Sequence, residues 1–176
     1  MPDLLLGCGS SRERRIKWGG RTAWADPVTL DFNDDHKPDV VHDISKIPLP
    51  FPDNTFDEIH AYEVMEHVGQ QGDWKFFFEQ WSDLWRILKP DGVFCGTSPA
   101  WNSPWAWGDP GHTRIISMEC LVFLHQPSYT AQVGKTPMTD YRFCYKADFQ
   151  PLHIKTNDGL GFEYVLKAVK PSRITV

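Results

Sequence analysis

The sequence predicts an α/β fold, a mostly parallel sheet that is flanked by helices and completed by an antiparallel hairpin near the C-terminal end. Short apolar runs that suit buried strands alternate with helical periodicity, a pattern typical of parallel sheets with right-handed crossovers. Late in the chain, Asn157-Asp158-Gly159 separates two strand-like runs, which predicts the hairpin. Since the chain has 176 residues, of which 41% are hydrophobic, we expect a single domain over residues 1–176.

The first third of the chain is expected to supply most of the parallel strands. The apolar run Asp3–Leu6 ends at a glycine, and a short helix is expected to follow it over residues 10–17. Further strands are expected at residues 28–32, 39–42 and 56–62.

A long amphipathic helix is expected over residues 74–88. Asp73 is a suitable N-cap. Apolar side chains then recur at helical spacing, at Trp74, Phe77, Phe78, Trp81, Leu84, Trp85 and Leu88. The turn residues 89–92 are expected to end this helix and to introduce a fifth strand over 93–97.

The remaining residues are expected to form loops, one more helix and the hairpin. A loop rich in proline and tryptophan covers residues 98–111, and an amphipathic helix is expected over 117–124. Residues 126–149 show no regular pattern, and the hairpin strands are expected at 152–156 and 162–169.

Charge and composition exclude several classes of function. The net charge of −5 and the isoelectric point near 5.8 argue against general affinity for nucleic acid or membranes, which requires a basic surface. One local exception is a basic cluster, which is either a solvated face or a phosphate-binding patch. It consists of Arg12, Arg14, Arg15, Lys17 and Arg21.

The cysteines and the first residues indicate a cytoplasmic protein in a reducing compartment. None of the four cysteines forms a C-x-x-C pair, so no zinc site is expected from them. Met1-Pro2-Asp3 does not have the basic start of a signal peptide, and no apolar run is long enough to span a membrane.

The stretch Leu4-Leu5-Leu6-Gly7-Cys8-Gly9-Ser10 has the form of a nucleoside-binding turn. A buried strand leads into two glycines, which let the backbone turn sharply and approach a ligand closely. Asp31 stands about twenty residues beyond this turn, at the end of the next expected strand, where a carboxylate can accept both ribose hydroxyls.

Four blocks in order resemble the class I S-adenosylmethionine-dependent methyltransferases, and in particular the small predicted methyltransferases of bacteria and phages. They are the glycine turn, Leu30-Asp31, the stretch from Asp39 to Ile59, and Leu88-Lys89-Pro90-Asp91-Gly92. The resemblance covers about residues 3–98 and implies a Rossmann-like fold with S-adenosylmethionine as the cofactor. One departure is Ser11, which stands where the family's third glycine is usual.

The resemblance also implies which residues contact the cofactor. Gly7, Cys8, Gly9 and Ser10 would lie at the methionine carboxylate, and Asp31 at the ribose. Asp43 matches the position that contacts the adenine amino group, with Ile44 beside the ring. Tyr62 and Glu63 follow the fourth strand directly and are expected to face the sulfonium.

Glu63 and His67 lie one helical turn apart, which raises the question of a metal site. Their spacing matches neither H-E-x-x-H nor H-x-x-E-H, so we expect no bound metal. His67 is expected either to satisfy backbone groups or to act as a general base or orient the acceptor.

The segment Trp105 to Arg114 is expected to fold over the same edge of the sheet. There, His112 could accept a proton, Asp109 could orient His112, and Arg114 could hold an anion. The alternative is a rigid aromatic lid that carries a surface ion pair.

The expected reaction is methyl transfer from S-adenosylmethionine to an unidentified acceptor, a small molecule or a macromolecule, by in-line displacement. Residues 1–98 would bind the cofactor, and the loops and hairpin of 99–176 would meet the acceptor, chiefly through 98–116 and 126–148. The alternative is a non-catalytic accessory protein that binds S-adenosylmethionine or S-adenosylhomocysteine. A nicotinamide dehydrogenase is disfavoured, since Arg12 stands where G-x-G-x-x-G needs its last glycine.

Overall fold

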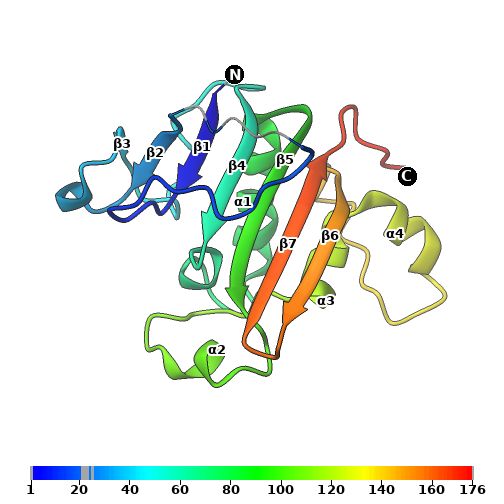
Figure 1. The fold of residues 1–176 in the computed structure, drawn as a ribbon. Helices are drawn as coiled ribbons and strands as arrows, with labels where there is room; N and C mark the ends of the chain where they lie inside the picture. Colours follow the sequence, from blue (N-terminus) through cyan, green and yellow to red (C-terminus); the bar gives the residue numbers. More distant parts are fainter. Residues whose placement is uncertain (1, 21–23, 25, 176) are drawn as a thin grey trace.

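The computed structural model describes residues 2–20, 24 and 26–175, and it contains a seven-stranded sheet in the order β3-β2-β1-β4-β5-β7-β6 (Figure 1). The strands are β1 (Asp3–Leu6), β2 (Val28–Asp31), β3 (Val40–Val41), β4 (Phe56–Tyr62), β5 (Leu88–Pro99), β6 (Phe149–Asn157) and β7 (Gly161–Ala168). The first five pair in parallel, whereas β7 is antiparallel to both β5 and β6. The predicted Rossmann-like fold with a C-terminal hairpin is confirmed.

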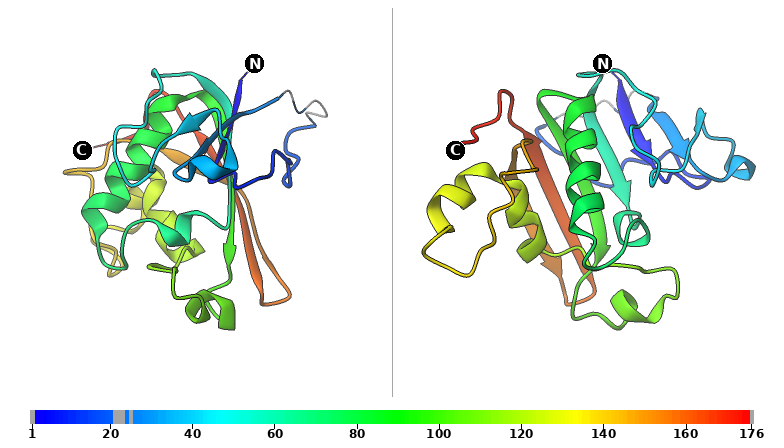
Figure 2. Two further views of the ribbon diagram at one scale, coloured as in Figure 1. Left: turned by 90° about the vertical axis from the view of Figure 1, so that its left-hand side faces the viewer. Right: turned by 180° about the vertical axis from the view of Figure 1, so that it is seen from behind.

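The helices are α1 (Trp74–Ile87), α2 (Pro104–Gly108), α3 (Met118–Leu121) and α4 (Gln126–Gln132), with short 3-10 turns η1 (Asp34–His36), η2 (Met65–His67) and η3 (Val122–Leu124). Figure 2 shows α1, α3 and α4 on one face of the sheet. None of the helices in the described residues is both long and apolar enough to cross a membrane.

Helix α1 carries the main core against the sheet. The Asp73 side chain accepts a hydrogen bond from the Phe76 N–H and caps the helix, as predicted. Trp81 is fully buried and packs edge-on against Phe94 of β5 and Phe149 of β6. These contacts fix α1 under the centre of the sheet.

The opposite face of the sheet is crossed by an extended segment, residues 10–20, and the helix predicted at 10–17 is wrong. The Tyr62 hydroxyl accepts hydrogen bonds from the backbone N–H groups of Arg15 and Ile16. These donors are therefore used by the sheet rather than by helical carbonyls. Ile16 packs in a small second core with Leu5 and Val165.

A buried polar network anchors this extended segment to β4. The Arg14 guanidinium makes two hydrogen bonds to the Glu58 carboxylate, at 2.7 and 3.0 Å. Glu58 also contacts His60 Nε2 at 2.8 Å, and His60 Nδ1 contacts the Tyr62 hydroxyl at 2.6 Å. The network buries the Arg14–Glu58 ion pair against the face of the sheet. Because burying two charges costs desolvation free energy, the pair stabilises the fold only if its hydrogen-bond geometry is good.

Four further elements differ from the predictions in the second half of the chain. β5 starts at Leu88, because the expected turn 89–92 continues the strand. Helix α2 lies inside the expected loop 98–111, and the expected helix 117–124 is divided between α3 and η3. Helix α4 occupies part of the segment predicted as irregular, because Pro127 starts it and Tyr129 is buried.

Replacing Arg14 by methionine is expected to lower the free energy of unfolding by about 3–5 kcal/mol, since the buried Glu58 carboxylate would lose its ion pair with the Arg14 guanidinium. Both side chains are only 4% exposed. Chemical denaturation measures the effect. Lys167→Met is the control, because Lys167 pairs with Asp91 on the surface and should contribute about 0–1 kcal/mol. An Arg14→Met variant as stable as this control would show that the network does not support the fold.

Candidate functional site

A cavity of about 590 Å³ lies at the carboxyl ends of the parallel strands. It is lined by Gly7, Gly9, Leu30, Asp31, Phe32, His36, His42, Asp43, Ile44, Ser45, Glu63, Val64, His67, Val68, Gly69 and Gly111. In open α/β sheets this edge is where ligands bind. Apart from Gly111, the residues of the cavity lie at the end of β2 or in the segments that follow β1, β2, β3 and β4, so the ends of four neighbouring strands meet at one hollow.

The glycine turn after β1 lies at the middle of this edge. Gly7 and Gly9 have φ values of +56° and +51°, in the left-handed region that favours glycine. A Cβ on Gly7 would lie 2.6 Å from Val64 Cγ2, whereas a Cβ on Gly9 would meet nothing within 4 Å. Gly7 is thus required by close packing, and Gly9 leaves space in the cavity wall.

Asp31 ties the glycine turn to the end of β2. It is only 6% exposed, and its Oδ2 accepts a hydrogen bond of 2.9 Å from the Gly9 N–H. Its Oδ1 accepts a second hydrogen bond, also 2.9 Å, from the Asn33 N–H. Since each carboxylate oxygen has two lone pairs, both can still accept a hydrogen bond from a ligand.

The far end of the cavity contains Asp43 and Ile44. The Asp43 carboxylate accepts a hydrogen bond from the Ser45 N–H, and the contacts with Ser45 hold the pKa of Asp43 below its usual range. Phe32 also lines this end with 78% of its surface exposed. Phe32 was not predicted from the sequence, although an apolar residue directly after Asp31 was a usable signal.

Three residues predicted at the cofactor do not line the cavity. Tyr62 lies on the opposite face, because side chains alternate along β4 and Tyr62 shares the face of Glu58 and His60. Cys8 belongs to the same opposite core. Ser10 is exposed and is not among the lining residues, although its hydroxyl contacts Nδ1 of His36, which does line the cavity, at 3.1 Å.

Glu63 marks the point where the chain leaves β4. It has a φ of +57°, which is uncommon for a residue with a Cβ, and its N–H donates to the Thr97 carbonyl. Such backbone strain is found mainly at functional positions. The resulting turn directs the chain into η2 and leaves Glu63 in the cavity wall.

The predicted acceptor residues His67 and His112 lie together. Their rings are 4.5 Å apart and edge to face, and His67 Nδ1 contacts the Gly111 carbonyl at 3.1 Å. His67 lines the cavity, and His112 lies behind it with a side chain that is 8% exposed. Asp109 Oδ2 is 3.9 Å from His112 Nε2, so Asp109 is near His112 but outside the cavity wall.

Glu66 joins this group and was not singled out from the sequence. It is 2% exposed, its Oε2 accepts from the Ser98 hydroxyl, and its Oε1 has no hydrogen-bond partner. Burial and the neighbouring Glu63 carboxyl raise the pKa of Glu66 to about 7. The spacing of three residues between Glu63 and Glu66 was the available signal.

Arg114 does not hold an anion in the way the sequence suggested. Its guanidinium donates to the Met65 carbonyl and to Gln80 Oε1, and it lies over the Phe77 ring. The buried Arg114 side chain therefore stabilises η2 through its hydrogen bond to the Met65 carbonyl.

The sequence model of a family described as methyltransferase domain matches residues 4–96, just over half of the chain. This chain belongs to that family. The matched region contains the glycine turn, Asp31, Asp43 and the Glu63–His67 turn, whereas His112 lies beyond it. Among curated proteins, none matches this chain.

Several solved structures share the fold of this chain, among them SAM-dependent methyltransferases. A SAM-dependent methyltransferase from Aquifex aeolicus has a TM-score of 0.57 and 13% identity, over 96% of this chain and 82% of that one. One from Archaeoglobus fulgidus has a TM-score of 0.56 and 16% identity, over 94% and 85%. The YcgJ protein from Bacillus subtilis has a TM-score of 0.54 and 13% identity, over 97% and 92%.

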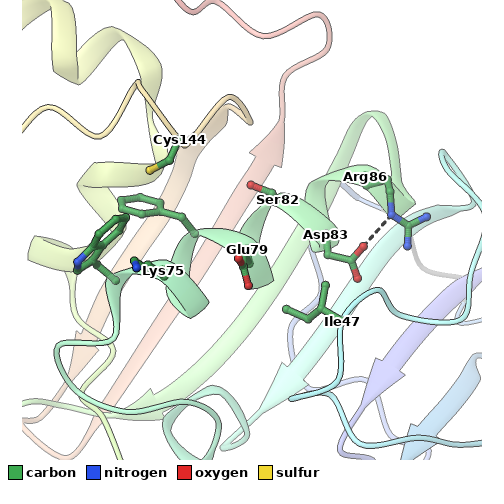
Figure 3. Close-up of a pocket in the computed structure, with 9 residues that line it drawn as sticks. Ile47, Lys75, Glu79, Ser82, Asp83, Arg86 and Cys144 are labelled. Carbon is green, nitrogen blue, oxygen red and sulfur yellow. Dashed lines mark hydrogen bonds and ion pairs between the residues drawn. The ribbon is translucent and has the colours of Figure 1, made fainter.

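A second hollow of about 580 Å³ runs along the outer face of α1, shown in Figure 3. Two of its charged groups are paired within the protein: Arg86 Nε donates to Asp83 Oδ1, and Asp83 Oδ2 accepts from the Leu49 N–H. It lies on a helix face, away from the ends of the strands, and none of the glycine turn lines it. The cavity at the strand ends is therefore the candidate active site of this methyltransferase domain.

Proposed function

We propose that this chain transfers a methyl group from S-adenosylmethionine to an acceptor that binds at the Glu63 and His67 end of the cavity. One observation carries the proposal. A single cavity joins the glycine turn, the buried Asp31 carboxylate and Asp43 to a group of ionisable side chains after β4. Residues suited to bind a nucleoside and residues suited to proton transfer thus line the same cavity.

The residues present suit the cofactor. The backbone at Gly9 leaves open space, so a ligand can approach the main chain closely. Asp31 would accept hydrogen bonds from the ribose hydroxyls while it continues to hold the Gly9 N–H. Asp43 would accept from the adenine amino group, with Ile44 beside the ring.

The chemistry requires little beyond alignment. The sulfonium methyl is already activated, so the acceptor attacks the methyl carbon as the carbon–sulfur bond breaks, and the bonding pair passes to sulfur. Holding the two reactants in line can contribute up to about 7–11 kcal/mol to lowering the barrier. Glu63, His67 and His112 are proposed to position the acceptor and to assist the loss of its proton.

The acceptor is proposed to contact the segment 98–116 above this end of the cavity. Gly111 lines the cavity, and Trp105 and Trp107 of helix α2 are 66% and 72% exposed. The segment 126–148, also expected to meet the acceptor, contributes no residue to the cavity. We therefore propose the segment 98–116 as the main acceptor contact, and a contact with 126–148 stays a prediction.

Asp31→Asn is expected to weaken S-adenosylhomocysteine binding by about 1–3 kcal/mol, because the ribose hydroxyls would lose a carboxylate acceptor and meet an amide instead. Calorimetry on the purified chain measures the affinity. Asp35→Asn is the matched control, since Asp35 lies on η1 and does not line the cavity. Equal affinity for both variants would remove Asp31 from the ribose site, and no binding by the unmodified chain would refute the cofactor proposal.

Gly7→Ala and Gly9→Ala are expected to have different effects. The first should destabilise the fold by about 1–3 kcal/mol beyond the cost of a positive φ, because its Cβ meets Val64. The second should mainly lower S-adenosylhomocysteine affinity, because its Cβ enters the cavity. Gly20→Ala, with a φ of +70° and open space, controls for the backbone cost. Equal loss of affinity in Gly9→Ala and Gly20→Ala would contradict the assignment of Gly9.

Transfer itself is tested with labelled S-adenosylmethionine and fractionated cell extract that supplies small molecules, nucleic acids and proteins. Label transferred to one fraction by the unmodified chain, and at least tenfold less by Asp31→Asn, is the expected result. S-adenosylhomocysteine binding without transfer to any fraction would instead support a non-catalytic accessory protein.

A further inference from the structure

We propose that Glu66, His67 and His112 bind a divalent first-row metal ion at the acceptor end of the cavity. The metal site itself stands on the side chains described below. Its role toward the acceptor rests on the proposed methyl transfer.

The ligand atoms already lie close enough to converge on one ion. One carboxylate oxygen of Glu66 and one ring nitrogen each of His67 and His112 lie within 4.8 Å of one another. Ligand bonds of about 2.0–2.2 Å give ligand-to-ligand distances of about 3–4 Å around a metal. Small side-chain adjustments therefore complete the site.

Two of the three groups have a buried atom that lacks a protein partner. Glu66 Oε1 and His112 Nδ1 are both buried, and neither makes a hydrogen bond. Buried polar atoms in folded proteins are nearly always paired with protein, water or an ion. Two such atoms on neighbouring side chains indicate a shared ligand rather than two separate defects.

The hydrogen bonds around the histidines suit metal ligands. If His67 Nδ1 donates to the Gly111 carbonyl at 3.1 Å, His67 Nε2 keeps its lone pair. Metal-binding histidines are commonly oriented by such a contact on the other ring nitrogen. Likewise, the Asp109 carboxylate is on the Nε2 side of His112, at 3.9 Å, and leaves Nδ1 as the ligand atom.

The backbone holds this arrangement in place across a long sequence separation. The N–H groups of Thr113 and Arg114 both donate to the Glu66 carbonyl, and the Gln71 N–H donates to the Thr113 carbonyl. These bonds bring His112 beside η2. From the sequence, only the Glu63–His67 spacing was considered, and we expected no bound metal, because no local pattern connects Glu66 and His112 with His67.

The cationic Arg114 side chain near the Glu66 carboxyl group makes its hydrogen bonds to other groups. Glu63 lies close to Glu66, so two carboxyl groups share this end of the cavity. The buried Arg114 guanidinium interacts electrostatically with Glu66, but it donates its hydrogen bonds to the Met65 carbonyl and to Gln80. A divalent cation would balance the carboxylates, and a mixed imidazole and carboxylate set suits ions such as Mn²⁺, Fe²⁺, Co²⁺ or Zn²⁺.

A metal ion at this position favours an acceptor that carries a hydroxyl group. An ion beside the cavity can bind a hydroxyl oxygen and lower its pKa, so that the proton leaves to water. The oxygen then forms a bond to the methyl carbon, the carbon–sulfur bond breaks, and its electron pair stays on sulfur. The products are a methyl ether and S-adenosylhomocysteine.

The test is Mn²⁺ binding to the untagged full chain after treatment with a chelator and dialysis, with free Mn²⁺ counted by electron paramagnetic resonance. One ion per chain is expected. Glu66→Gln, which keeps the Ser98 contact, and His112→Asn should each weaken binding at least tenfold. His67→Asn should do the same, and because His67 is exposed, this variant keeps the test valid if a buried variant fails to fold.

His153→Asn is the matched control, because His153 pairs with Glu163 on the β6–β7 hairpin and should leave Mn²⁺ binding unchanged. A chain that binds neither Mn²⁺ nor Zn²⁺, or variants that bind as tightly as the control, would overturn the metal site. S-adenosylhomocysteine affinity is measured on the same samples. Its persistence without metal binding refutes only this inference, whereas its absence from the unmodified chain refutes the proposed function.

Discussion

The hydrogen bonds that the Asp31 carboxylate accepts at the end of β2 are the interaction on which the cavity depends. Parallel pairing of β1 with β2 brings the glycine turn beside Asp31, and the carboxylate then fixes Gly9 at 2.9 Å. Because β4 pairs with the other side of β1, the Glu63 turn arrives at the same edge. Three chain segments thereby meet around one space.

The two faces of the sheet contribute in different ways. Helix α1 and its aromatic contacts provide the main core, whereas the extended segment 10–20 covers part of the other face through the Arg14, Glu58 and Tyr62 network. This division explains why β4 can carry ionisable side chains on one face and end in a cavity-lining residue. Because side chains alternate along β4, Glu58, His60 and Tyr62 lie on the face opposite the cavity, whereas Glu63, which follows the strand, lines the cavity.

Much of the sheet could be predicted because apolar runs and turn residues encode it locally. Asp3–Leu6 and Phe56–Tyr62 have the predicted bounds. The helix at 10–17 could not be excluded in this way, because a tyrosine on β4, distant in sequence, takes its backbone donors. Tyr62 was placed at the cofactor from its position after the strand, and only the side-chain alternation assigns it to the opposite face.

The candidate site was predictable where its residues end a strand and not where a loop folds back. Asp31 ends a strand, Gly7, Gly9, Asp43 and Glu63 follow strands, and all five line the cavity. Glu66 and the proximity of His112 depend on hydrogen bonds between η2 and residues 113–114, which no local pattern announces. Long-range backbone pairing therefore determines the chemistry at the acceptor end.

The most direct measurement is a crystal structure of this chain with S-adenosylhomocysteine. The account predicts ribose hydroxyls within hydrogen-bond distance of the Asp31 carboxylate, adenine beside Ile44, and sulfur at the end of the cavity that contains Glu63 and His67. A ligand seated in the hollow along α1, or bound with its sulfur toward Phe32, would contradict it.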